Sequence, residues 1–203
     1  MKTILHLTVG ILGLAIFTAA KPEPIKTIPI SFNQLLPDTQ KQVECLAKNV
    51  YYEAGGESEP GKRAVAFVTL NRVAMGFGPD ICSVVQQKVK STCQFSWWCE
   101  AKRKINYTKY QESRRIALEV YLNYERMYDL THGATHFHTT AVRPNWTDLT
   151  KTTVIGNHIF YKAKKNTYAK KTKFGVEQQL RSITEFVYAA DGGHYTSDVS
   201  TDY

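Results

Sequence analysis

A glutamate at the predicted end of a helix is the residue best placed for chemistry in this sequence. Glu53 follows the apolar Val50 and Tyr51 and precedes Gly55-Gly56, which end the helical pattern. The helix dipole opposes negative charge at a C-terminal end, and apolar neighbours add to this, so both raise the pKa of the carboxyl. A carboxyl that stays protonated near neutral pH suits a general acid for glycosidic bond cleavage. On these residues alone, an ordinary glutamate at a surface helix end is an equal alternative.

A second carboxylate, Glu57, lies four residues further on, beyond the glycine break. It therefore need not share a helix face with Glu53, and it is a candidate for substrate contact. We expect it rather to orient the loop or to pair with a cation such as Arg63 or Arg72. Glycosidases that retain or invert configuration use two carboxylates that flank the bond.

Aromatic, amide and imidazole side chains supply the groups that bind a sugar ring. An aromatic face covers the apolar face of a pyranose, while polar groups bind its hydroxyls. The candidates are Asn71, Gln94, Phe95, Trp97, Trp98, His138, Trp146 and His158. The aromatic residues fit a core equally well, Asn71 fits a buried hydrogen-bonding strut, and the two histidines fit a structural role.

A helical half followed by a strand-forming half must position these residues. Apolar residues at helical spacing predict a helix from about 39 to 53, with Thr39 and Gln42 as a capping box. Two more helices are expected, one buried from Pro60 to about 73 and one over 110–124. Strand-forming segments at 135–140, 152–154 and 158–162 then predict a small antiparallel sheet, with Gly156-Asn157 as a two-residue turn. The fold class is therefore α+β.

The N-terminus and the cysteines point to export. Residues 1–20 have the charge, apolar stretch and small residues of a secretory signal peptide, and residues 21–38 form a proline-containing linker. A releasable membrane anchor is the other interpretation of residues 1–20. Four cysteines (Cys45, Cys82, Cys93 and Cys99) predict two disulfides with three pairings open. We expect an exported catalytic domain over 39–163.

Basic charge indicates an anionic partner. The formal net charge is +8, and it becomes +7 when Lys2 leaves with the signal peptide. Residues 164–203 are expected to form a basic linker, a short amphipathic helix and a polar tail. Six lysines from Lys162 to Lys173 are expected to hold the protein on anionic wall polymers, or to form a solvated linker. Nucleic acid is the partner least indicated, because no basic helix with interleaved aromatic residues occurs.

Several blocks in order resemble the SleB/CwlJ cell-wall hydrolase family over about residues 43–162. They are CLAKNVYYEAGGE from Cys45, AVAFVTLNRV from Ala64, CQFSW from Cys93, GATHFH from Gly133 and IGNHIFY from Ile155. The resemblance implies a lysozyme-like helical core, a lytic transglycosylase acting on muramyl–glucosaminyl bonds, and Glu53 as the catalytic acid/base. The family has Arg where this chain has Gly55, which lengthens the glycine break but leaves the acid in place.

Two other functions compete with this one. His136 and His138 are spaced for zinc on one strand, with His158 on a neighbouring strand, as a metal-dependent N-acetylmuramoyl-L-alanine amidase would require. The sequence lacks His-Glu-x-x-His and a carboxylate at metal spacing, so we expect no metal and no cofactor. The third candidate is a non-catalytic wall-binding protein, and product analysis separates all three.

Overall fold

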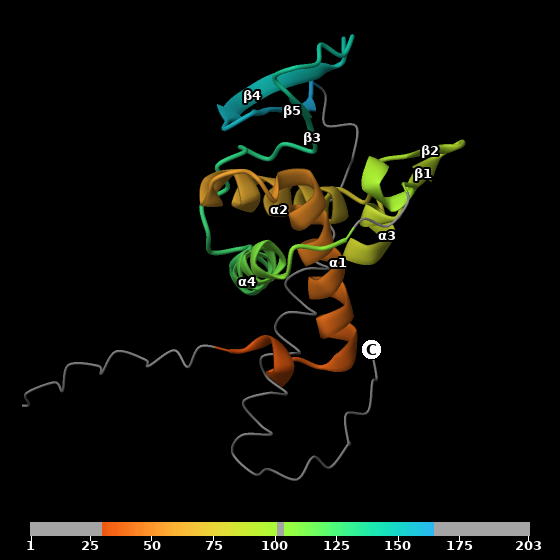
Figure 1. The fold of residues 1–203 in the computed structure, drawn as a ribbon. Helices are drawn as coiled ribbons and strands as arrows, with labels where there is room; N and C mark the ends of the chain where they lie inside the picture. Colours follow the sequence, from red (N-terminus) through yellow and green to blue (C-terminus); the bar gives the residue numbers. More distant parts are fainter. Residues whose placement is uncertain (1–29, 101–103, 165–203) are drawn as a thin grey trace, which may run out of the picture.

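The computed structural model describes residues 30–100 and 104–164 of the 203-residue chain. The predicted signal peptide 1–20 and all but the first residue of the segment 164–203 lie outside this part. Within it, helices come first and a small antiparallel sheet follows, so the predicted α+β class is confirmed (Figure 1). In chain order the elements are η1 (Phe32–Gln34), α1 (Pro37–Ala54), α2 (Glu59–Ala74), α3 (Ile81–Val85), β1 (Lys88–Val89), β2 (Thr92–Cys93), η2 (Ser96–Trp98), α4 (Tyr107–Asn123), β3 (His136–Thr139), β4 (Leu149–Ile155) and β5 (His158–Ala163).

Helix α1 begins two residues before Thr39, so the capping box predicted there is wrong. Pro37 occupies the first helical position, where its fixed φ angle favours helix and its missing N–H costs nothing. Gln42 instead accepts a hydrogen bond of 3.1 Å from the backbone N–H of Cys82. Leu35 is already buried, so the packed structure starts before residue 39.

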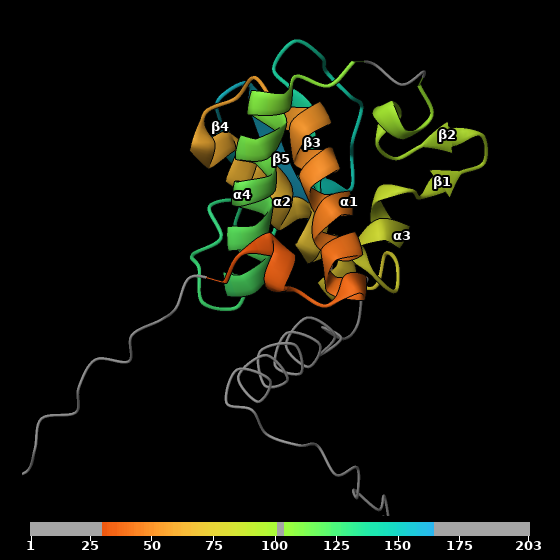
Figure 2. The ribbon, with the colours of Figure 1, turned by 60° about the horizontal axis from the view of Figure 1, so that its bottom comes forward.

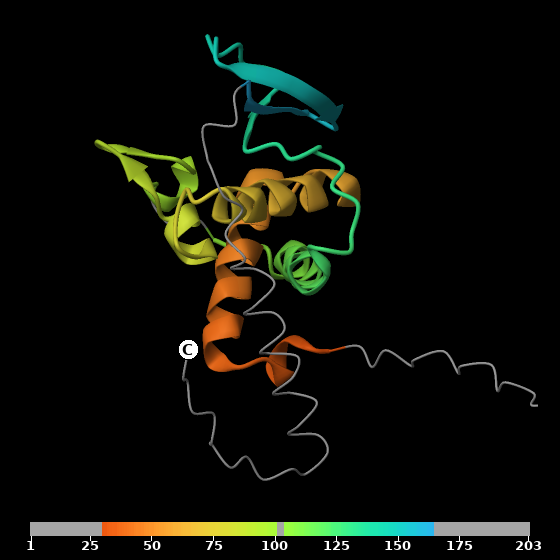
Figure 3. The same cartoon turned by 180° about the vertical axis from the view of Figure 1, so that it is seen from behind.

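The core forms where α1, α2 and α4 meet. Helix α2 is buried nearly all round, as predicted, because the sheet β3–β5–β4 lies on one side of it and α4 on the other (Figures 1 and 3). Helix α1 runs across both helices and ends at Ala54, followed by Gly55. The C-terminal end of α1 is therefore held by packing, and Glu53 lies in its last turn.

The three-stranded sheet has the order β3–β5–β4, with all neighbours antiparallel. Gly156 has a φ of +56° in the β4–β5 turn, which confirms the predicted two-residue turn. Thr139 pairs with His158, and His138 pairs with Ile159. Because side chains alternate along a strand, His158 shares a face with Phe137 while His136 and His138 project from the other face.

Two disulfides form, as predicted, and they select one of the three pairings. Cys45–Cys82 joins α1 to α3, and Cys93–Cys99 closes the segment that contains Trp97 and Trp98. Figure 2 shows the β1–β2 hairpin beside α3 and away from the sheet β3–β5–β4. The second disulfide thus fixes a short aromatic segment at the edge of the helical core.

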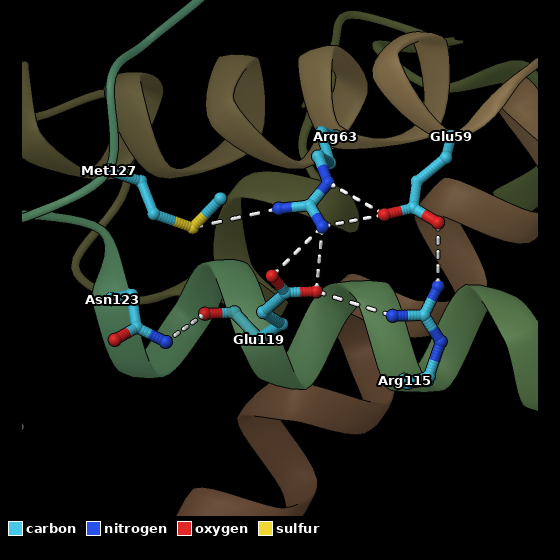
Figure 4. Close-up of polar contacts among 6 residues, drawn as sticks. All are labelled: Glu59, Arg63, Arg115, Glu119, Asn123 and Met127. Atoms are coloured by element: carbon cyan, nitrogen blue, oxygen red, sulfur yellow. Dashed lines mark hydrogen bonds and ion pairs between the residues drawn. The ribbon is translucent and has the colours of Figure 1, made fainter. Parts of the chain in front are cut away.

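Ion pairs join the first two turns of α2 to α4 (Figure 4). The Nη2 atom of Arg63 lies 2.6 Å from an oxygen of Glu59 and 2.9 Å from an oxygen of Glu119. Arg115 contacts the same two carboxylates, at 2.9 and 3.3 Å. Arg63, which was one of the cations expected to pair with Glu57, therefore pairs with other carboxylates.

No helix within residues 30–100 and 104–164 combines the length and the apolar content needed to cross a membrane.

Candidate active site

Glu53 is a half-buried carboxyl with a raised pKa. Burial removes water from the carboxyl and raises its pKa to about 7, while the charge of Arg72 lowers it and that of Glu100 raises it. Within the described residues, no group donates a hydrogen bond to this carboxyl. The predicted direction of the pKa shift is confirmed, and its largest cause is burial and not the helix end. At neutral pH such a group both gives and takes a proton.

An aromatic wall stands next to Glu53. The ring of Trp97 stacks on that of Tyr52, with centroids 4.6 Å apart and planes at 17°. The Nε1–H of Trp97 donates to Oδ1 of the buried Asn49 at 2.9 Å. Asn49 precedes Glu53 by four residues on α1, so the residue that holds the indole lies on the same face of the helix as the carboxyl. Trp98 meets Trp97 edge to face and is 42% exposed, so it offers a ring to solvent.

Arg72 links three parts of the fold near Glu53, although the sequence indicated it only as a partner for Glu57 and not as a site residue. Its Nε–H donates to the backbone oxygen of Thr135 at 2.6 Å, and its guanidinium lies 4.8 Å from the ring centre of Phe95. Both Arg72 and Phe95 are buried. Burial of a charged guanidinium costs free energy unless the group has partners. Arg72 is buried next to Glu53 in spite of this cost, so we include it among the residues of the site. A charged residue at the end of the apolar run in α2 is the sequence signal that indicates a buried arginine here.

Four aromatic side chains gather on the face of the sheet that carries His136 and His138. Trp146 meets His136, His138 and Tyr161 edge to face, at centroid distances of 5.8, 5.4 and 5.4 Å. His138 also stacks on Tyr161, and its Nε2 lies 3.0 Å from that hydroxyl. His136 approaches Phe77, and its pKa falls to about 4 because of burial and the charge of Arg72. The charge of Arg72 thus acts on both His136 and Glu53, so this face of the sheet lies near the candidate acid.

Glu57 holds the turn between β4 and β5. Its carboxylate accepts hydrogen bonds from the backbone N–H of Asn157 at 3.1 Å and from the Asn157 side chain at 3.0 Å. The backbone N–H of Asn157 is the main cause of a lowered pKa for Glu57. This arrangement agrees with the expected role in orienting a loop.

Three candidate residues lie in the interior, where the structure favours a role in the fold over the predicted contact with sugar. Asn71 donates to Asp129 and to the backbone oxygen of Ala134, each at 3.0 Å, and accepts from Tyr124. Phe95 is 2% exposed and His158 is 3% exposed. Their rings therefore have almost no surface to offer a ligand. Gln94, in contrast, is exposed next to the disulfide segment.

The three histidines of the zinc hypothesis do not converge on one point. His136 and His138 lie on one face of the sheet, whereas His158 lies on the opposite face against Phe137 and Phe160. In the described part of the chain, no three His, Cys, Asp or Glu residues form a group suited to a metal ion. The strands therefore do not bring these three histidines together into the zinc site that the amidase hypothesis required.

Comparison with known proteins gives a family match. The family described as Cell Wall Hydrolase matches residues 56–161, about half of the chain, and this range begins three residues after Glu53. Among solved structures, the chain is similar to the catalytic domain of the SleB protein of Bacillus cereus, with 26% identity and a TM-score of 0.46. That similarity covers 61% of this chain and 91% of the other. The curated proteins include no significant match.

Proposed function

The chain belongs to the cell wall hydrolase family, and on that basis we propose that it cleaves the glycan strand of peptidoglycan with Glu53 as acid/base. The observation that supports this proposal is the raised pKa of Glu53, about 7, in a half-buried setting next to the charge of Arg72. A carboxyl that is partly protonated at neutral pH can donate a proton to the leaving oxygen of a glycosidic bond. The charge of Arg72 then stabilises the carboxylate that remains.

The reaction proposed is that of a lytic transglycosylase at the muramyl–glucosaminyl bond. Glu53 protonates the leaving oxygen as that bond breaks. The 6-hydroxyl of the muramyl residue attacks the anomeric carbon, and Glu53 accepts its proton. No water is consumed, so one carboxyl serves both steps. This agrees with the state of Glu57, whose carboxylate is occupied by Asn157.

Substrate contact is assigned to the exposed and half-buried members of the candidate set. Trp97 and Trp98 lie on the side of the disulfide segment, together with Gln94. Trp146 and His138 lie on the side of the sheet, where Trp146 is 39% exposed. A sugar ring buries its apolar face against such rings, while amide and imidazole groups bind its hydroxyls. Phe95 and His158 support these surfaces from within, whereas Asn71 holds the loop around Asp129.

Export is part of the proposal. Both disulfides are compatible with an oxidising compartment, where a wall enzyme acts. We propose that residues 1–20 direct the chain there and that the lysines from Lys162 to Lys173 bind anionic wall polymers. A mature protein that begins at Lys21 is the expected product. An intact mass that includes residues 1–20 in the exported protein would contradict cleavage of the signal.

Mass spectrometry of the muropeptides released by the purified protein tests the reaction. Lytic transglycosylase action leaves 1,6-anhydro-muramyl ends, because the 6-hydroxyl replaces water. Reducing muramyl ends would instead identify a hydrolytic muramidase, freed stem peptides an amidase, and no product a binding protein. Addition of EDTA is expected to leave the activity unchanged. Activity that EDTA removes and zinc restores would favour the amidase.

A further inference from the structure

A cavity of about 400 Å³ lies apart from Glu53, between the end of α2 and the segment that follows α4. Its walls include Phe67, Tyr124, Glu125, Tyr128, Asp129 and His132. Glu53 does not line it, and neither do Arg72 and Glu100, whose charges act on Glu53. The volume is within the range of pockets that hold small ligands. The proposed cleavage of the glycan strand makes no use of this cavity.

The cavity is built by a rigid loop. Asp129 accepts hydrogen bonds from the backbone N–H groups of Thr131 and Gly133, at 2.7 and 2.8 Å, and from Asn71 at 3.0 Å. His132 and Gly133, which lie at the rim of the cavity, both adopt positive φ angles of +55° and +78° in this loop. The wall is therefore held in one shape by contacts that reach back to α2. Such a cavity does not need to be reorganised before it binds.

Its charge is opposite to that of the protein. The lining residues include two carboxylates, Glu125 and Asp129, and no lysine or arginine, whereas the whole chain has a net charge of +8. Burial raises the pKa of Tyr124, and the negative charges of Asp129 and Glu125 raise it further, so both carboxylates act on the cavity wall. A cation is the ligand that this field favours.

The aromatic side chains narrow the choice of cation. Tyr128 is 70% exposed at the rim, and Tyr124 stands further in. Aromatic faces next to carboxylates bind an alkyl ammonium group well, because the ring attracts the charge and the ring surface covers the methylene groups. Both oxygens of Asp129 accept hydrogen bonds within the protein, so Glu125 is the carboxylate left to contact the ligand directly. One carboxylate is enough for an ammonium group, whereas a metal ion such as Ca²⁺ takes about six to eight oxygen ligands.

We propose that this cavity binds the side-chain ammonium group of a peptide stem of peptidoglycan. The inference rests on the peptidoglycan substrate of the proposed function and not on the role of Glu53. Asn71 lines the cavity, and the next residue, Arg72, acts on Glu53, so the two sites lie on sides of α2 about 100° apart. The lysine is the third residue of the stem, so its backbone reaches about 10 Å from the sugar and its four-carbon side chain extends this further, enough to pass the width of one helix, about 10–12 Å. A stem on a sugar bound beside Glu53 can therefore enter the cavity.

Calorimetric titration of the full chain with a stem peptide tests the proposal. The probe is N-acetyl-L-Ala-γ-D-Glu-L-Lys-D-Ala, and its partner probe carries an acetylated lysine side chain. Neither contains a glycosidic bond, so binding is measured without cleavage and does not depend on the glycan activity. The free amine is expected to bind at least about tenfold more tightly, because acetylation removes the charge and its ion pair. Equal binding of the two peptides would overturn the proposal.

Variants at the exposed rim locate the binding. Glu125→Gln and Tyr128→Ala are each expected to raise the Kd about three- to tenfold, and Tyr128→Phe is expected to leave it nearly unchanged. Asp148→Asn, an exposed carboxylate outside the cavity, is the matched control and keeps the wild-type Kd. If all four variants bind alike, or if a disaccharide of N-acetylhexosamines displaces the peptide, the cavity is not an ammonium site.

Discussion

Glu53 and Glu57 lie four residues apart, and their surroundings move their pKa values in opposite directions. Burial raises that of Glu53 to about 7, whereas hydrogen bonds from Asn157 lower that of Glu57. The glycine break between them separates the two carboxyls, so one enters the edge of the core and the other reaches the sheet. Carboxyls whose environments differ in this way take different roles. Glu53 suits proton transfer and Glu57 suits support of the β4–β5 turn.

Replacement of the Glu53 carboxyl is expected to remove catalysis and to keep the fold. Glu53→Gln is nearly isosteric and cannot exchange a proton, so the rate of wall lysis should fall at least about a hundredfold. Asp148→Asn is the control for loss of a carboxylate. Turbidity loss of purified cell walls gives the rate, and circular dichroism checks the fold. A rate within a fewfold of wild type would remove Glu53 from the mechanism.

The stability of the protein should depend on the protonation of Glu53. Its folded pKa of about 7 lies above the ordinary value of 4.5, so the folded state binds more protons between these pH values. The contribution of this group to stability is therefore present below about pH 4.5 and is lost as pH rises towards 7. Denaturant unfolding should show Glu53→Gln gaining on wild type across this range and no further above it. If the difference in unfolding free energy between the two proteins does not change with pH, the pKa of Glu53 is not raised in the folded state.

The clamp between Glu57 and the β4–β5 turn predicts a coupled pair of substitutions. Alanine at 156 must adopt a φ of +56°, and its Cβ would collide with Oε2 of Glu57. The backbone strain alone costs about 1–2 kcal/mol. Gly156→Ala should therefore destabilise the wild-type protein more than it destabilises Glu57→Ala. Unfolding free energies of both single variants and the double variant measure the coupling. Additive losses would show that Glu57 does not approach the turn.

The two neighbouring tryptophans should respond differently to substitution. Trp97→Phe leaves Oδ1 of the buried Asn49 without its donor, at a cost of about 1–3 kcal/mol of stability. Trp98→Ala removes an exposed ring, so the melting temperature should stay near that of wild type while KM for the glycan rises. Thermal melts and steady-state kinetics on soluble glycan fragments separate the two effects. A Trp98→Ala variant with an unchanged KM would exclude this ring from the substrate site.

The long-range disulfide should matter more for stability than the short one. Cys45–Cys82 spans 37 residues and Cys93–Cys99 spans 6. The loop-closure entropy removed from the unfolded chain is equivalent to about 4 kcal/mol for the first and about 2 kcal/mol for the second. Paired Cys→Ala variants, compared by urea unfolding, should follow this order. The Cys93→Ala/Cys99→Ala variant should lose a larger fraction of its activity than of its unfolding free energy, because that disulfide holds the segment with Trp97.

Local sequence determined the helices, the turn and the candidate acid. The apolar spacing before Glu53, the glycines after it and the Gly156-Asn157 pair act over a few residues, so their structure follows from the residues themselves. The α+β class followed from the same signals, and so did the direction of the pKa shift of Glu53, although its largest cause, burial, depends on the packed fold. The cap at Thr39 was wrong because Pro37 also starts a helix, and the proline determined the first turn.

Tertiary structure alone decided which side chains meet. Arg72 acts on Glu53 because α2 packs under the end of α1, and Phe95 is buried because the disulfide segment folds over Arg72. The pairing of four cysteines depends on distances across the fold, which spacing along the chain does not give. His158 lies opposite Thr139 and not opposite His138. A register shift of one residue exchanges the two faces of a strand, so only the assembled sheet separates His158 from the other two histidines.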